Sequence, residues 1–301
     1  MKTTYSHEDI QYFLVVKEHA DPESIAQLQE GHISQALRFE TIDGEKLVLR
    51  IAETDDDFRA DKYVYDTFGA ALHVPKITEI GVFSGTAAHC ISELALGKTT
   101  DALSSDEMER ALPSIQNALA AIFLHDISNT TGYGHPDLST GNASYSNWKE
   151  ASGREIEERG IEAFRTNASN IGLDGALIDK FFIQFRTNLP CASEQRRLLH
   201  GDPAFNNMLV DNDQVTAIID WAQFGYGDWM SDFARLDFWH PGRYGDSKVF
   251  ATKYGLDANN LQERKALYWA TNALWTIEFA DKAKNTDVTH WLQEYVATKL
   301  V

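Results

Sequence analysis

The chain has 301 residues, and its 27 Lys plus Arg stand against 45 Asp plus Glu, a formal net charge of −18. This balance argues against a nucleic-acid partner, which requires a basic surface. On charge alone plain solubility is the preferred explanation, and attraction of a cationic substrate is the alternative. The length allows two lobes, and no run approaches the roughly 20 apolar residues of a membrane span. The polar N-terminus and two distant cysteines, Cys90 and Cys191, predict a cytoplasmic protein without disulfides or a thiolate metal site.

The first third predicts a small antiparallel sheet. Ile10, Phe13, Leu14 and Lys17 have the spacing of an amphipathic helix. Residues 24–53 then alternate apolar and polar side chains and break at "EGHIS" and "DGE", which predicts three strands. Further along, the patterns predict one helix over 56–72 and two strands over 74–97.

The remaining two-thirds predict mainly helices. From Ser104 a Ser cap precedes a long stretch with helical apolar spacing. Later helices are expected over residues 145–163, 174–187, 229–238, 258–281 and 287–299, with short strands between 198 and 219. The stretch "ELALGKTT" (93–100) is the predicted connection between two parts of the chain.

Polar residues interrupt the short strands of the helical part in "LLHGDPAFNNMLV" (198–210), and "VTAIIDWAQFGYGD" (215–228) supplies another carboxylate. Any one of these residues could belong to an ordinary turn. Together, carboxylate and amide oxygens suit Mg²⁺, and a spare Asp can accept a proton from a hydroxyl. This is the minimum apparatus for moving a phosphoryl group.

The order of His200, Asp202, Asn207 and Asp220, in "HGDPAFNN…IIDW…GD", resembles the small-molecule branch of the protein-kinase-like superfamily, the aminoglycoside and choline kinases. The resemblance implies an α+β, bilobal fold. A nucleotide-binding sheet lobe with one helix would span 1–95, and a larger, mainly helical lobe for catalysis and substrate would span 96–301.

By the same resemblance, Asp202 is the catalytic base, and Asn207 and Asp220 hold Mg²⁺. The nucleotide is ATP, with GTP as the alternative. His200 is expected to fix the loop backbone through hydrogen bonds rather than to react.

Further nucleotide residues follow from the resemblance in the first lobe. Ser34, in the loop "EGHISQA" (30–36), would cover the phosphates. Arg50, in "KLVLRI", stands where the superfamily usually carries Lys, and Asp61 is its expected helix partner. A surface Arg and a solvated helix charge are the plain alternatives. The stretch "CISELALG" resembles the hinge strand that faces adenine, which implicates Ile91, Ser92 and Leu94.

Residues 30–103 resemble the hygromycin B phosphotransferases, the 4-O-kinases of this family, and imply an aminoglycoside as substrate. Asp232 is assigned to structure, as a tie between loop and helix cap. Core packing is the alternative for the aromatic residues on the substrate side. The candidate substrate residues are Gln223, Asp228, Trp239, Asn272, Trp275 and Glu278.

The resulting hypothesis is a monomeric, ATP- and Mg²⁺-dependent O-phosphotransferase that inactivates an aminoglycoside, hygromycin B first among them, with no nucleic-acid or membrane partner. A kinase of another small alcohol such as choline or homoserine is the alternative within the class. A pseudokinase-like nucleotide-binding module is the rival outside it, although such a module would have no need of a base. A metal-dependent hydrolase would commonly need His-rich ligands, which this sequence does not offer.

Overall fold

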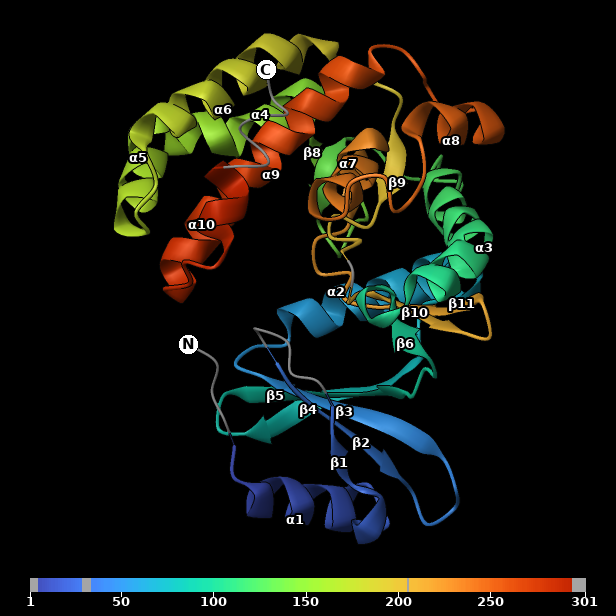
Figure 1. Cartoon of the computed structure of the whole chain (residues 1–301). Coiled ribbons are helices and arrows are strands. Elements are labelled where there is room, and N and C mark those ends of the chain that lie inside the picture. The colour runs from blue at the N-terminus through green and yellow to red at the C-terminus, as the bar shows by residue number, and fades with distance from the viewer. Residues whose placement is uncertain (1–4, 29–33, 205, 294–301) are drawn as a thin grey trace. The chain divides into compact units, whose positions relative to one another are not determined.

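The computed structural model describes residues 5–28, 34–204 and 206–293 (Figure 1). The chain forms two compact units, of which the first comprises Met1–Ser114 with Asn206–Ala222 and the second Ile115–Phe205 with Gln223–Val301. Antiparallel sheets and helices occur in both, so the predicted α+β class is confirmed. The functional division at residues 95 and 96 stays a prediction.

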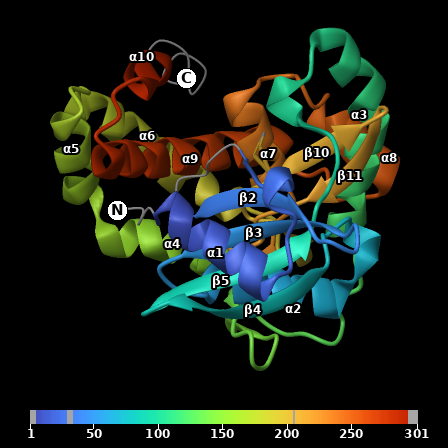
Figure 2. The same ribbon diagram turned by 90° about the horizontal axis from the view of Figure 1, so that it is seen from below.

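A five-stranded antiparallel sheet, in the order β1-β2-β3-β5-β4, forms the centre of the first unit, as the alternating patterns predicted. Helix α1 (His7–Lys17) lies across this sheet in Figure 2, and its start is capped by the Ser6 side chain. The strands are β1 (Ala26–Gln27), β2 (Gln35–Glu40), β3 (Lys46–Ala52), β4 (Ile77–Ser84) and β5 (Ala87–Glu93).

Strand periodicity sends alternate side chains of the sheet to two different cores. Ile10 and Leu14 of α1 pack against Leu49 and Ile91 on one face. Phe58 of α2 (Asp56–Phe68) packs with Cys90 on the other. Because Arg50 follows Leu49 and pairs in register with Cys90, its side chain lies on the α2 face, with its guanidinium carbon 5.0 Å from the centroid of the Phe58 ring.

A second, three-stranded sheet completes the first unit and carries the late polar residues. Strands β10 (Met208–Asp211) and β11 (Gln214–Ile218) form a hairpin, and β6 (Lys98–Thr99) pairs with β10. Asn212 and Asp213 join the hairpin strands with φ values of 49° and 63°. Two consecutive positive φ angles are typical of the tight turns that match strand twist, and Asn and Asp tolerate them best among non-glycine residues.

The second unit is mainly helical, and α6 packs beside α9 in it (Figure 1). Helix α3 (Ser105–Phe123) continues from the first unit into the second. The helices that follow are α4 (Trp148–Arg159), α5 (Ile161–Asn170), α6 (Gly175–Asn188), α7 (Met230–Trp239), α8 (Ser247–Tyr254), α9 (Leu261–Ala283) and α10 (Val288–Trp291). Of these, α5 and α8 were not predicted, and the predicted helix over 287–299 lies outside the described residues from position 294 onward.

A small four-stranded sheet, β8-β7-β12-β9, also belongs to the second unit. Its strands are β7 (Tyr133–Pro136), β8 (Ala143–Tyr145), β9 (Arg197–Leu199) and β12 (Gly225–Gly227). Sequence patterns predicted β9 alone, because strands of three or four residues are too short to show periodicity. Within the described parts of the chain, no helix is both long and apolar enough to cross a bilayer.

Candidate active site

The loop that carries Asp202 follows strand β9 and turns sharply at Gly201. A Cβ atom on Gly201 would lie 1.9 Å from the carbonyl oxygen of Gln223, and the φ of Gly201 is +82°, so glycine is required there. The backbone N–H of Asp202 donates to Nδ1 of the fully buried His200 over 3.2 Å. The expectation that His200 fixes the loop backbone is therefore confirmed.

Asp232, near the start of α7, anchors the same loop. Its carboxylate accepts the backbone N–H of His200 at 2.7 Å and that of Gly201 at 3.1 Å. Burial raises the pKa of Asp232 to about 7, although the two backbone hydrogen bonds and the nearby Arg235 oppose the shift. The structural role expected for Asp232 is confirmed, and the contact explains how an irregular loop keeps one backbone path.

Arg235, one helical turn after Asp232, contacts the side chain of Asp202. Its Nε donates to Oδ1 of Asp202 over 2.7 Å, and its Nη1 donates to Oδ1 of Asn272 over 3.1 Å. Asn272 is in turn fixed by a 2.8 Å bond from its Nδ2 to the carbonyl of Tyr268. Sequence reasoning did not single out Arg235, because nothing in the pattern of α7 distinguishes it from a solvated helix charge.

Asn207 and Asp220 flank one end of the β10–β11 hairpin in the first unit. Met208 and Ile218 are register partners, and the N–H of Ile219 donates to the carbonyl of Asn207 over 2.9 Å. Asp220 follows with a φ of 65°, a conformation that costs energy for a non-glycine residue. Amide and carboxylate oxygens at one hairpin end form a donor set that fits Mg²⁺.

Arg50 and Asp61 form an ion pair on the α2 face of the large sheet. Nη2 of Arg50 lies 2.6 Å from Oδ2 of Asp61, and the same nitrogen donates to Sγ of Cys90 over 3.6 Å. Burial lowers the pKa of Arg50, but Asp61 and Cys90 outweigh it and hold that pKa above its ordinary value. Asp61 is buried, so the alternative of a solvated helix charge is wrong for this residue.

The other side of the Asp61 carboxylate reaches the hairpin segment. Oδ1 of Asp61 accepts the backbone N–H of Trp221, the residue after Asp220, over 2.7 Å. The Trp221 ring is itself buried, and its Nε1 donates to the carbonyl of Ile218. One carboxylate therefore joins the expected phosphate residue Arg50 to the backbone beside an expected metal ligand.

The other expected nucleotide residues are less well placed. Ser34 is half-buried, but residues 30–33 of its loop lie outside the described residues. Ile91 is buried in the core beneath α1, which does not support a contact with adenine. The N–H of Leu94 donates to the carbonyl of Lys46 over 3.0 Å, so it is used within the sheet. Ser92 is buried in β5 between its register partners Val48 and Ile77.

Asp228, one of the expected substrate residues, has a different environment from the one predicted. It is fully buried and forms a two-pronged ion pair with Arg264, in which Nε donates over 2.8 Å. It also accepts the hydroxyl of Tyr268 at 2.7 Å and the N–H of Ser193 at 3.1 Å. Its carboxylate holds α9 to the loop before α7, so the expected substrate contact is wrong for Asp228.

Two expected substrate residues on α9 lie beside Arg159. Trp275 is half-buried, and the guanidinium of Arg159 lies over its ring at 5.4 Å. Glu278 is buried, and its Oε1 lies 2.7 Å from Arg159 and 2.5 Å from Lys282. Two cations therefore already neutralise Glu278.

Gln223 and Trp239, the remaining substrate residues expected, lie before and within α7. Gln223 is exposed. Trp239 stacks on Trp291 of α10 with ring centroids 5.2 Å apart and planes within 13°. An aromatic pair of this kind is compatible with core packing, which was the alternative for Trp239.

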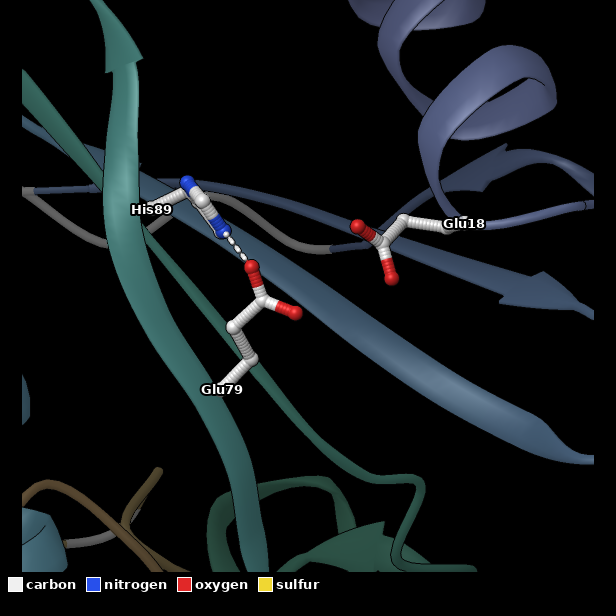
Figure 3. A group of neighbouring side chains, drawn as sticks. All are labelled: Glu18, Glu79 and His89. Carbon is white, nitrogen blue, oxygen red and sulfur yellow. Dashed lines mark hydrogen bonds and ion pairs between the residues drawn. The ribbon is translucent and has the colours of Figure 1, made fainter.

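A separate polar cluster of Glu18, Glu79 and His89 lies on the α1 face of the large sheet (Figure 3). Nε2 of His89 lies 3.1 Å from Oε1 of Glu79, and Glu18 faces the pair from the end of α1. Burial and the neighbouring Glu79 raise the pKa of Glu18. The His89 ring packs against Phe13 and over Gly81, where a Cβ would come within 2.6 Å of it, so Gly81 makes room for the ring.

A mixed α+β fold, a glycine-dependent Asp202 loop and a hairpin end with hard oxygen donors are features that a small-molecule phosphotransferase needs. Residues 24–264 match the phosphotransferase enzyme family, and the chain belongs to that family. It is 32% identical over 218 residues to the hygromycin-B 4-O-kinase of Escherichia coli, an alignment that covers 72% of this chain and 62% of that protein.

Solved structures give the same result. The crystal structure of aminoglycoside phosphotransferase APH(4)-Ia superposes with a TM-score of 0.81 at 27% identity, covering 98% of each chain. A thermostable mutant of it, in a ternary complex with AMP-PNP and hygromycin B, superposes with a TM-score of 0.80 at 26% identity, covering 97% of this chain and 98% of that one. The kinase-like fold predicted from the resemblance is confirmed.

Proposed function

We propose that this protein is an ATP-dependent O-phosphotransferase that inactivates an aminoglycoside, and that hygromycin B is its substrate. The observation that carries the proposal is the similarity over nearly the whole chain to a structure with AMP-PNP and hygromycin B bound. The chain spans 62% of the length of the curated relative it matches, so the activity and substrate of this chain are proposals. We also expect a cytoplasmic monomer.

The residues of this chain have distinct roles in the proposed reaction. Arg50, held by Asp61, would bind nucleotide phosphates through its planar guanidinium. Asn207 and Asp220 would hold Mg²⁺, which supplies neutralisation of phosphate charge. Asp202 would accept the proton of the substrate hydroxyl while the bond from that oxygen to the γ-phosphorus forms and the bond to the leaving ADP breaks.

The charge of the whole chain supports a cationic substrate. Aminoglycosides carry several protonated amines, and a formal net charge of −18 attracts them over long range. Nearby carboxylates would then hold the amines through charge-assisted hydrogen bonds and orient one hydroxyl. Among the expected substrate residues, Gln223 is exposed, so its amide is free to hydrogen-bond a bound aminoglycoside.

The proposal is tested by incubating the purified protein with ATP, Mg²⁺ and one of hygromycin B, kanamycin, choline or homoserine, followed by mass spectrometry. We expect hygromycin B to gain one phosphate. A mass gain on kanamycin alone would keep the aminoglycoside class and overturn the substrate. A gain on choline or homoserine alone would overturn the class, and nucleotide binding without any transfer would indicate the pseudokinase-like alternative.

A further inference from the structure

Helix α7 contacts both the backbone of the Asp202 loop and the side chain of Asp202. Asp232 accepts two backbone N–H groups of the loop, and Arg235, three residues later on the same helix face, holds the Asp202 side chain. The backbone contact fixes where the loop runs. The contact from Arg235 fixes where the carboxylate points, which the backbone contact alone leaves to the rotamers of Asp202.

We propose that Arg235 is a positioning residue that orients the carboxylate of Asp202 for proton abstraction. This inference rests on the proposed function, in which Asp202 is the base. Arg235 uses two nitrogens of one rigid plane, with Nε on Asp202 and Nη1 on Asn272. Because that plane cannot bend, fixing its Asn272 end also fixes its Asp202 end.

The second anchor is itself immobile. Asn272 is buried on α9, and its amide nitrogen donates to the carbonyl of Tyr268 one turn earlier. This bond orients the amide so that Oδ1 faces Arg235. The position of the Asp202 carboxylate is therefore fixed, through Arg235, relative to the long helix α9. Several of the expected substrate residues lie on this helix.

Folding alone gives little reason for this pair. The side chains of Arg235 and Asp202 are each 30% exposed, and ion pairs with that access to water contribute little to stability. Orientation is different, because a small misplacement of a reacting group can lower turnover about 100-fold. A Lys at this position would keep the charge but lose the rigid link between Asp202 and Asn272.

The test is steady-state kinetics with ATP and hygromycin B for the wild type, Arg235→Ala, Arg235→Lys and Asp202→Ala. We expect Arg235→Ala to lower kcat about 10- to 100-fold with the KM for ATP within about twofold, and Arg235→Lys to recover part of the loss. Millimolar guanidinium should raise the kcat of Arg235→Ala and leave Asp202→Ala unchanged. Arg186→Ala, which removes an exposed ion pair with Glu157, is the matched control and should match the wild type.

Each outcome bears on either the positioning role of Arg235 or the assignment of Asp202 as base. An Arg235→Ala enzyme with wild-type kcat, or one whose loss is matched by a lower melting temperature and is not restored by guanidinium, would overturn the positioning role. Full activity in Asp202→Ala would overturn the base assignment itself. Loss in Asp202→Ala with no effect of Arg235→Ala would keep the proposed function and reject this inference alone.

Discussion

Asp61 accepts the backbone N–H of Trp221 at 2.7 Å, across 160 residues of sequence. The same carboxylate lies 2.6 Å from Nη2 of Arg50. Asp61 on helix α2 therefore connects Arg50 of strand β3 to the segment that begins with Asp220. One buried acceptor thus contacts both the expected phosphate residue Arg50 and the backbone N–H next to Asp220. Changing Asp61 should disturb both.

Asp61→Asn keeps an acceptor for Trp221 and removes the charge that balances Arg50. Breaking a buried ion pair typically costs 3–5 kcal/mol, and we expect about 3 kcal/mol because the Arg50 side chain is 20% exposed. Denaturant unfolding measures the loss, and the KM for ATP should rise in parallel. Asp66→Asn, on the same helix, breaks only the exposed pair with Lys62 and should cost about 0.5 kcal/mol or less. Equal losses in the two variants would contradict the role of Asp61.

Asp220→Ala removes a charged ligand of the expected metal site, whereas Asn207→Ala removes a neutral one. We therefore expect both variants to need more Mg²⁺ for ATP binding, with the larger shift in Asp220→Ala. Titration of ATP binding at several Mg²⁺ concentrations measures the shift. Binding with an unchanged Mg²⁺ requirement in both variants would remove these two residues from the metal site.

Asp232 gives a pH dependence whose sign is fixed by its raised pKa. The folded protein keeps a proton on Asp232 up to about pH 7, whereas the unfolded chain releases it near 4. The contribution of this group to stability is therefore complete below about pH 4 and is lost as the pH rises through about 7. Because Asp232→Asn lacks that titration, its deficit in unfolding free energy should be larger at pH 5 than at pH 8. A deficit that grows with pH would show that the folded-state pKa is not raised.

Glu18, on the α1 face of the large sheet, also has a raised pKa, so its effect on stability changes with pH in the same direction as that of Asp232. Burial and Glu79 raise its pKa, so its ionised form destabilises the fold at neutral pH. Glu18→Gln should be more stable than the wild type at pH 7, by up to about 1 kcal/mol, and equal to it in acid, where both side chains are neutral. Thermal melting from pH 4 to pH 8 tests this, with the exposed Glu45→Gln as control. A less stable Glu18→Gln at pH 7 would contradict the expectation.

Much of the first unit could be predicted from local sequence. Strand alternation and the turns "DGE" and "SGT" located the strands, whereas the pairing of Arg50 with Asp61 was expected only from the family resemblance. Helix α5 (Ile161–Asn170) was missed because it follows α4 after a single residue, Gly160, and the predicted helix over 145–163 ended near its start. Strands β7, β8 and β12 have three or four residues each and depend on pairing between distant segments.

The candidate site also has residues that could be predicted from local sequence and residues that could not. Order and spacing brought out Asp202, Asn207 and Asp220 as the expected base and metal ligands, because these three candidates come from one short stretch. The partners of Asp228 could not be predicted, since Arg264 lies 36 residues away and only the packing of α9 brings it there. Arg235 was missed for a similar reason: its partners Asp202 and Asn272 are 33 and 37 residues away on other elements.

The proposed activity is phosphoryl transfer from ATP to hygromycin B with Asp202 as base. Following γ-labelled phosphate from ATP into hygromycin B, with wild type and Asp202→Ala at saturating ATP and Mg²⁺, tests this activity. We predict label in hygromycin B with the wild type, and a rate about 10²- to 10⁴-fold lower with Asp202→Ala at similar nucleotide affinity. Equal rates in the two proteins, or no label in hygromycin B with the wild type, would contradict it.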